Sequence, residues 1–361
     1  MIYSAQPVVE RQRGHPVQWA YIGSFTSGGG RGITVAAVDA ATGALTPRTS
    51  VDAVVNPSCL ALARDTGVLY AVSDTEPGAV AAFRTGVDGS LSALGPAVDV
   101  GGRGPTHLSV AGRRLLTANY GSGSVSSLAM GPDGSVSDAP VVLAHHGSGP
   151  DEERQREPHA HQVLPDPGGR WVLSVDLGTD SVRVCALDQD TGELRVRAET
   201  VLRAGSGPRH LAFHPDGEVA YVLHELEPQM TVCRWDPAYG RLEPLAEVAI
   251  EPEGAPEGER VHPSVVSVSP DGRFVRAAVR GSNRVLTFSL ADGPEKPQLT
   301  SGVDCGGSWP RDLVADPSGR WLYVVNEWSG DVTWFDVDAE SGQLRRGGAV
   351  EVPAAACVVF S

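Results

Sequence analysis

Short apolar runs separated by tight turns dominate the pattern of this chain. Runs rich in valine, leucine and tyrosine flank turns of the Pro-Asp-Gly or Pro-Ser-Gly type, most clearly in segments 211–222, 265–278 and 313–324. Two such runs joined by a tight turn are typical of an antiparallel hairpin. Apolar positions at helical spacing are nearly absent. The pattern therefore predicts an all-β protein built from hairpins.

The hairpins recur in phase along the chain. A Gly-x-Leu or Gly-x-Val turn recurs six times, and a longer turn at 293–299 fills the one gap in the series. A proline opens an apolar run at six places in register with these turns, and the seventh proline is displaced to Pro353. The turn glycines are Gly43, Gly89, Gly134, Gly192, Gly240 and Gly342, and the prolines are Pro57, Pro105, Pro158, Pro208, Pro263 and Pro310. Repeats of about 45 to 50 residues with four strands each are typical of propeller blades. Seven repeats predict a seven-bladed β-propeller with four antiparallel strands per blade.

The two ends of the chain predict how the ring of blades closes. The first repeat begins at Trp19 without a proline-led strand, whereas segment 353–360 supplies an isolated one at the C-terminus. We therefore expect segment 357–360 to complete the first blade. Residues 19–361 then form a single propeller domain, preceded by an N-terminal extension of residues 1–18. Two packed β-sandwiches would not explain seven repeats in phase with a spare terminal strand.

Composition narrows the possible functions. The chain has 29 Lys and Arg against 44 Asp and Glu, a net charge of −15, so its average surface repels nucleic acid and anionic membranes. The five cysteines form no Cys-x-x-Cys pair, and the carboxylates form no dense ligand cluster. We expect a monomer or weak homodimer that needs no metal or cofactor. Without a secretory signal or a long apolar run in the sequence, the expected location is cytoplasmic.

The repeat also predicts where a site would lie. In a hairpin the start of the first strand lies beside the end of the second, so both positions share one rim. In a propeller this rim surrounds the mouth of the central channel. The candidate residues at or near it are His107, Asn119, His159, His161, Asp176, Arg209, His210, Glu225, Arg280 and Arg311. A cationic, titratable pocket in an acidic protein indicates a small anionic substrate.

Several of these residues also have a purely structural interpretation. A histidine close to the proline can bond a neighbouring backbone carbonyl, which for His107 and His210 is as reasonable as a role in binding. Asp176 fits a turn cap better than a chemical role. Arg209 could form an ion pair between blades, and Glu225 could merely neutralise it. For these residues the sequence leaves both interpretations open.

The fourth repeat differs from the others in a way that favours function. A charged excursion at 151–157 lengthens it immediately before His159 and His161, and a loop at this place could cap the channel. His161 also stands where other repeats have a leucine. We therefore expect this histidine pair to belong to the site.

Several segments resemble the lactonase family of seven-bladed propellers, which includes one type of bacterial 6-phosphogluconolactonase and the fungal carboxymuconate cycloisomerase. The most specific are the Pro-His-Ala-His segment at 158–161 and the Gly-Pro-Arg-His segment at 207–210. Others are 21–26, 118–125, 146–150, 176–180 and 310–312. The resemblance spans essentially the whole chain. It implies an enzyme that hydrolyses a sugar-acid lactone, with 6-phosphogluconolactone as the expected substrate.

The resemblance and the rim together imply a role for each candidate. Arg209, Arg280 and Arg311 are expected to hold phosphate or carboxylate oxygens, because a guanidinium fork matches them. Glu225, or one histidine of the Pro-His-Ala-His segment, is expected to activate water against the lactone carbonyl. The remaining candidates, expected to contact substrate, are His107, Asn119, Asp176 and His210.

Two other functions stay open at this point. The same arginines could hold the carboxylates of a muconate while a histidine or Glu225 transfers a proton, as in a cycloisomerase. A propeller without activity could instead bind a protein partner. Such a scaffold needs exposed aromatic anchors on one face, whereas a lactonase needs convergent charge in the channel. The composition of the rim favours the enzyme.

Overall fold

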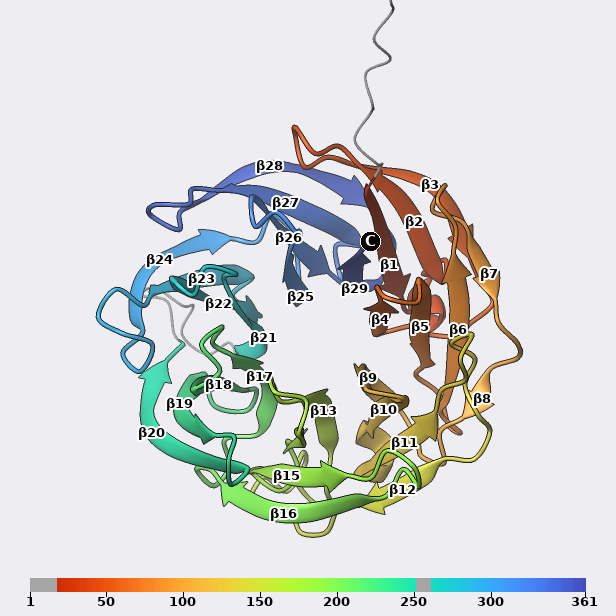
Figure 1. The fold of residues 1–361 in the computed structure, drawn as a ribbon. Coiled ribbons are helices and arrows are strands. Elements are labelled where there is room, and N and C mark those ends of the chain that lie inside the picture. The colour runs from red at the N-terminus through yellow and green to blue at the C-terminus, as the bar shows by residue number, and fades with distance from the viewer. Residues whose placement is uncertain (1–17, 251–260) are drawn as a thin grey trace, which may run out of the picture.

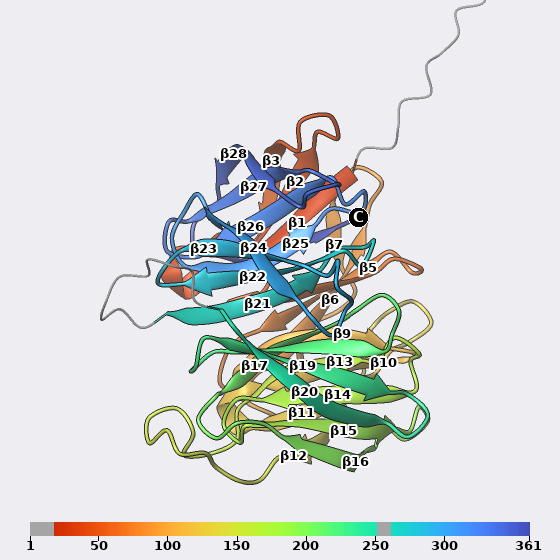
Figure 2. The same cartoon turned by 90° about the vertical axis from the view of Figure 1, so that its left-hand side faces the viewer.

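Seven antiparallel sheets surround a central channel, which confirms the predicted seven-bladed propeller (Figure 1). The computed structural model describes residues 18–250 and 261–361. Seen from the side, neighbouring blades lie against each other face to face (Figure 2). The expected N-terminal extension lies outside the described residues except for Gln18, which already belongs to the first strand.

The blades are numbered in chain order, and their strands run from the channel outward. Blade 1 contains β29 (Ala355–Phe360), β1 (Gln18–Ser24), β2 (Ile33–Val38) and β3 (Leu45–Val51), and blade 2 contains β4 (Leu60–Ala63), β5 (Val68–Ser73), β6 (Ala79–Thr85), β7 (Leu91–Ala93) and β8 (Val98–Asp99). Blade 3 contains β9 (Pro105–Ala111), β10 (Arg114–Asn119), β11 (Ser124–Ala129) and β12 (Val141–Ala144), and blade 4 contains β13 (Ala160–Pro165), β14 (Trp171–Asp176), β15 (Ser181–Leu187) and β16 (Leu194–Val201). Blade 5 contains β17 (Pro208–Phe213), β18 (Val219–His224), β19 (Gln229–Asp236) and β20 (Arg241–Ala249). Blade 6 contains β21 (His262–Val268), β22 (Phe274–Arg280), β23 (Arg284–Ser289) and β24 (Gln298–Asp304), and blade 7 contains β25 (Pro310–Ala315), β26 (Trp321–Asn326), β27 (Asp331–Val337) and β28 (Leu344–Glu351).

The C-terminal strand closes the ring as the sequence predicted. β29 pairs with β1, with Tyr21 opposite Val359 and Gly23 opposite Cys357. The first and last segments of the propeller therefore share one sheet (Figure 1). This pairing leaves the inner edge of β1 covered, so the ring has no open blade.

Blade 2 departs from the four-strand pattern. Its outer strand is divided into β7 and β8, which both pair with β6. The interruption contains Gly95, with a φ of 133°, followed by Pro96. A proline has no N–H to give to the ladder, and the glycine adopts a backbone conformation outside the strand region. The outer strand therefore breaks there.

The hydrophobic core lies between the blades. Seven buried clusters occur among the described residues, and each combines side chains of two neighbouring blades. The Gly-x-Leu turns belong to these contacts. Gly43 has a φ of 69°, and a Cβ placed on it would lie 2.5 Å from the Trp321 ring of blade 7. The turn requires glycine both for its backbone angle and for this close approach.

The described residues contain two helices, both a single 3-10 turn: η1 (Thr26–Gly28) and η2 (Tyr120–Ser122). Neither of these two helices is long and apolar enough to cross a bilayer.

Candidate active site

Strand register places the start of the first strand of a blade beside the end of its second strand. Pro208, the first residue of β17, pairs with His224 at the end of β18, and in blade 6 His262 pairs with Arg280. The same arrangement recurs in blade 7, where the start of β25 pairs with the end of β26. Because the blades repeat this order, the predicted rim around one mouth of the channel is present (Figure 1).

A buried carboxylate at this rim, Glu225, lies between three arginines. Its Oε2 forms ion pairs with Nε of Arg209 and Nη2 of Arg280, both at 2.8 Å. Its Oε1 accepts a hydrogen bond from Nη2 of Arg154 at 2.7 Å. Glu225 is only 5% exposed. The structure thus brings together three candidates from the sequence, Arg209, Glu225 and Arg280, and adds Arg154.

Backbone carbonyls fix the two buried arginines in place. Arg209 donates from Nη1 to the carbonyl of Ser264 in the neighbouring blade. Arg280 donates from Nε to the carbonyl of His262 at 3.0 Å. Guanidinium groups held in this way need little rearrangement to bind a ligand, so the cluster is preorganised.

The cluster is short of negative charge. Burial, together with the nearby Arg280, lowers the pKa of Arg209 to about 9. Burial also lowers the pKa of Arg280, against the attraction of Glu225. Although burial disfavours its charge, the arginines hold the pKa of Glu225 well below its usual range, so the carboxylate is ionised at neutral pH. Three guanidinium groups share one carboxylate, and this surplus positive charge favours an anionic ligand.

The charged excursion supplies the third arginine. Arg154 belongs to segment 151–157, between β12 and β13, and its Nη2 also donates to the Tyr120 hydroxyl at 3.1 Å. The adjacent Gln155 is fully buried and donates to the Asp180 carboxylate at 2.7 Å, which anchors the excursion to blade 4. The segment that was expected to cap the channel therefore reaches the charged cluster.

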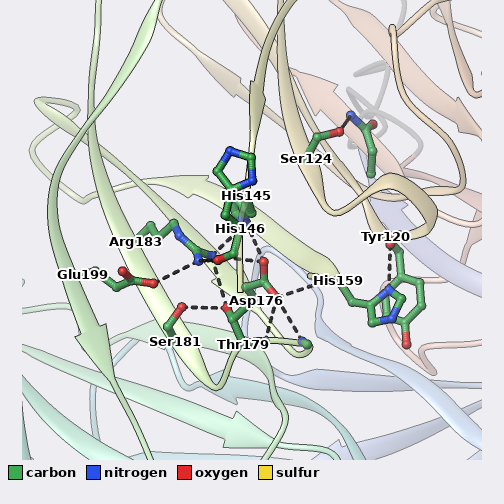
Figure 3. A network of polar contacts seen from close by, with 12 residues as sticks. Tyr120, Ser124, His145, His146, His159, Asp176, Thr179, Ser181, Arg183 and Glu199 are labelled. Atoms are coloured by element: carbon green, nitrogen blue, oxygen red, sulfur yellow. Dashed lines mark hydrogen bonds and ion pairs between the residues drawn. The ribbon is translucent and has the colours of Figure 1, made fainter. Parts of the chain in front are cut away.

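The two candidate histidines of this segment surround Tyr120. The His159 ring stacks on the Tyr120 ring with centroids 4.3 Å apart, and His161 meets that ring edge-on at 5.6 Å. Nδ1 of His159 lies 2.9 Å from the Tyr120 carbonyl oxygen (Figure 3). Because a carbonyl oxygen only accepts, this contact places a proton on Nδ1 and makes Nε2 the basic nitrogen of the neutral ring. Burial and the nearby Arg209 hold the pKa of His161 well below its usual range.

Asp176 lies directly behind His159 in a closed polar network (Figure 3). Its Oδ1 accepts from the backbone N–H of His159 at 2.9 Å, and its Oδ2 lies 2.5 Å from Nδ1 of His145 and 3.1 Å from Nη1 of Arg183. Asn119 is similarly buried, with both ends of its amide bonded to neighbouring serine and threonine hydroxyls. The polar atoms of both candidates are thus taken up by partners within the protein.

Arg311 lies at the same mouth but has its own partner. Its Nη1 forms an ion pair with Glu327 at 3.0 Å, and its guanidinium group lies 4.7 Å from the centre of the Phe25 ring. Its charge still acts on the main cluster, because it helps to lower the pKa of Arg209 after burial and Arg280. Arg311 therefore contributes to the positive potential from outside the Glu225 cluster.

The last two candidates lie along the channel. A cavity of about 710 Å³ occupies it, with Arg209 and His161 in its wall next to His107 and His210. The ring centroids of His107 and His210 are 6.2 Å apart. Burial lowers the pKa of His107 to about 4 and holds that of His210 well below its usual range. Both therefore line the channel as neutral groups at pH 7. Within the described ranges, no cluster of His, Cys, Asp or Glu is arranged to hold a metal ion.

The family of the chain follows from its match to known proteins. Residues 19–360 match the model of a family described as "Lactonase, 7-bladed beta-propeller". The chain belongs to this lactonase family. The match covers all seven blades of the lactonase, including the closing strand β29.

Relatives and solved structures agree with this assignment. The lactonase is 32% identical over 345 residues to the 6-phosphogluconolactonase of Bacillus subtilis, covering 94% of this chain and 97% of the relative. It superposes with a TM-score of 0.89 on a putative 6-phosphogluconolactonase from Bacteroides fragilis, with 27% identity over 98% of this chain and 100% of that one. It also superposes with a TM-score of 0.89 on the periplasmic gluconolactonase PpgL of Pseudomonas aeruginosa. The two proteins are 29% identical, and the match covers 95% of this chain and 99% of that one.

Arg154 and Trp309 lie at the candidate site but were not singled out in the sequence. Arg154 lies in a segment that was noticed only as a charged excursion. Trp309 immediately precedes Pro310, and its ring lies 5.2 Å from the guanidinium group of Arg280. The sequence signal for Trp309 is a bulky residue directly before the proline, whereas the candidate positions follow the proline or end the second strand.

Proposed function

We propose that this lactonase hydrolyses 6-phosphoglucono-1,5-lactone to 6-phosphogluconate at the mouth of the channel. The observation that carries the proposal is the surplus of positive charge around Glu225. A phosphate monoester carries about −1.5 to −2 charges at neutral pH, which matches the surplus. The names of several relatives support the same substrate.

The phosphate binds to the arginine cluster. Arg209 and Arg280 are desolvated and fixed by backbone carbonyls, so they offer guanidinium donors at little cost in reorganisation. Arg154 completes the cluster from the excursion, where its side chain is 34% exposed and accessible to a ligand. Glu225 is the positioning residue that holds the three guanidinium groups together against their mutual repulsion.

The lactone ring then points toward His159 and Tyr120. His159 Nε2 takes a proton from a water molecule whose oxygen attacks the lactone carbonyl carbon. The Tyr120 hydroxyl, which accepts from Arg154, has its own proton free to stabilise the oxyanion. When the intermediate collapses, the bond to the ring oxygen breaks, and the His159 imidazolium returns the proton to that oxygen as it becomes a hydroxyl group. Asp176 orients His159 through its backbone N–H.

The test is a direct comparison of substrates. The purified protein is assayed with 6-phosphogluconolactone, with glucono-1,5-lactone and with carboxymuconate, after subtraction of spontaneous lactone opening. We expect saturable hydrolysis of the phosphorylated lactone with the highest kcat/KM of the three. Turnover of carboxymuconate without lactone hydrolysis would contradict the proposal.

A cytoplasmic location and a monomeric or weakly dimeric state are proposed on the sequence alone. The structural neighbour PpgL, by contrast, is described as periplasmic.

A further inference from the structure

The guanidinium group of Arg280 has one face covered by an aromatic ring and one nitrogen without a partner. Its Nε donates to the carbonyl of His262 at 3.0 Å, and its Nη2 pairs with Glu225 at 2.8 Å. Within the part of the chain that the structure describes, Nη1 has no acceptor. The centre of the Trp309 ring lies 5.2 Å from the guanidinium carbon, a cation–π distance. Nη1 is therefore the nitrogen of Arg280 that can donate to an anionic ligand.

The backbone is held in an unfavourable conformation to place Trp309 there. Trp309 has a φ of 65°, in the left-handed region that a bulky side chain adopts only at an energetic cost. Its N–H donates to the side chain of Asn283 at 2.8 Å, which holds this conformation. Three other blades have a positive φ at the same position before the proline, where the residues are Asn56, Gly104 and Gly207. The preference of the backbone therefore does not explain the indole in blade 7.

A second indole supports Trp309 from the side away from Arg280. The rings of Trp309 and Trp328 stack with centroids 3.7 Å apart and an interplanar angle of 6°. Trp328 is 64% exposed, and its free face points away from the charged cluster. The stacking restricts rotation of the inner ring. Neither ring belongs to the buried clusters on the two sides of blade 7, so packing between the blades does not explain the pair.

We propose that Trp309 is a positioning residue that fixes the guanidinium group of Arg280 with Nη1 turned toward the bound phosphate. The inference rests on the proposed function, in which Arg280 binds that phosphate, and it adds the side chain that orients this arginine. A guanidinium group donates hydrogen bonds in its own plane and stacks on aromatic rings through its face. A ring on that face excludes water and attracts the cation without competing for the N–H groups that the ligand needs. Trp309 therefore acts on the phosphate only through Arg280.

A double-mutant cycle with inorganic phosphate tests this role without relying on turnover. Phosphate is titrated by calorimetry, at low ionic strength, into the parent, Trp309→Asn, Arg280→Ala and the double variant. Asparagine is chosen because Asn56 has a φ of 47° at the same position of blade 2, so the backbone conformation can be kept. Arg209 and Arg154 remain in the Arg280→Ala background, which keeps binding measurable. We expect Trp309→Asn to weaken phosphate binding about tenfold with Arg280 present and to have no effect without it.

Three further measurements distinguish positioning from a general loss of structure. Trp309→Phe keeps an aromatic face, so it should retain most of the affinity for phosphate. Tyr239→Ala removes an aromatic residue that is 79% exposed in the turn between β19 and β20, and it should bind phosphate like the parent. In hydrolysis of 6-phosphogluconolactone, Trp309→Asn should raise KM with little change in kcat, because His159 is untouched.

Three results would overturn the positioning role. They are a Trp309→Asn variant that binds phosphate like the parent, an equal loss of affinity with and without Arg280, and a Trp309→Phe variant that binds phosphate no better than Trp309→Asn. Failure of the proposed function has a different signature. In that case the parent does not hydrolyse 6-phosphogluconolactone, while the coupling between Trp309 and Arg280 in phosphate binding persists.

Discussion

At the scale of single residues, the surroundings of Glu225 and His159 divide their roles. The sequence left the base open between this carboxylate and the Pro-His-Ala-His pair. Glu225 contacts arginines through both oxygens, which stabilise its charged form and make it a weak base. His159 instead has Nδ1 bonded to a carbonyl, which leaves Nε2 to accept a proton.

Substitution separates the two roles. His159→Asn keeps an N–H donor for the Tyr120 carbonyl but removes the basic nitrogen, so we expect kcat to fall by about 10²- to 10⁴-fold with little change in KM. Glu225→Gln removes the carboxylate that compensates three arginines, so inorganic phosphate should inhibit at lower concentrations. Steady-state kinetics with phosphate as inhibitor measures both. A His159→Asn variant with the parent's kcat would refute the assignment of the base.

The pH profile gives an independent test of the base. Because the pKa of Glu225 lies well below its usual range, a Glu225 base would stay ionised and give a flat kcat/KM from pH 7.5 down to about 4.5. A neutral imidazole base loses its function when it takes up a proton, so with His159 as the base we expect kcat/KM to fall as the pH is lowered through this range. A flat kcat/KM profile of the parent, together with an inactive Glu225→Gln variant, would instead identify Glu225 as the base.

At the scale of elements, the repeat made most of the fold predictable. The turn glycine and the proline recur together along the chain, and this repeat predicts the number of strands, the number of blades and the closure of the ring. It does so because each blade buries its faces against its neighbours in the same way. The split outer strand of blade 2 was not predicted, since Pro96 was not weighed as a strand breaker. The rim rule, that the start of the first strand and the end of the second share one rim, holds in blades 5, 6 and 7. It could not predict which side chains meet across blades, because those contacts depend on long-range packing.

The rim rule was least informative for residues whose partners come from other segments. Asn119 and Asp176 occupy rim positions, but their side chains bond to neighbouring loops and strands. Arg154 reaches Glu225 from an excursion whose course no repeat predicts. Sequence patterns therefore predicted which residues lie at the rim better than the contacts that their side chains make.

Removal of the closing strand tests the ring as an element. Deletion of residues 357–361 takes away most of β29, including Phe360, which packs 4.7 Å from the Tyr323 ring and is 3% exposed. Loss of several buried apolar side chains should cost roughly 5 kcal/mol or more, a large part of the stability of a typical domain. We expect thermal unfolding at a much lower temperature, or insoluble protein. A truncated chain that melts like the parent would contradict the closure.

At the scale of the whole molecule, buried neutral histidines predict acid sensitivity. Burial lowers the pKa of His224, which is 1% exposed, to about 4, whereas an unfolded histidine titrates near about 6.5. Between these values the unfolded chain binds a proton that the folded chain does not. The free energy of unfolding should therefore fall as the pH is lowered from about 6.5 toward 4, by about 1.4 kcal/mol per pH unit for this histidine.

Urea unfolding at several pH values measures this loss. His224→Asn removes the titrating group, so its free energy of unfolding should fall less steeply below pH 6.5 than that of the parent. His107, whose pKa burial also lowers to about 4, acts in the same direction. Equal slopes for the parent and the variant would show that His224 does not titrate as its burial requires.

The central claim is that the arginine cluster selects a phosphorylated lactone, and one ratio tests it most directly. The ratio of kcat/KM for 6-phosphogluconolactone to that for glucono-1,5-lactone is measured in the parent, in Arg280→Ala and in Arg234→Ala. Arg234 is the control, because it lies near the end of β19 and pairs at 2.9 Å with Glu295, in the turn between β23 and β24. Loss of a desolvated ionic contact costs about 2 to 5 kcal/mol, so the ratio should fall by more than about tenfold in Arg280→Ala and stay unchanged in Arg234→Ala. A ratio that Arg280→Ala leaves at the parent's value would contradict the account.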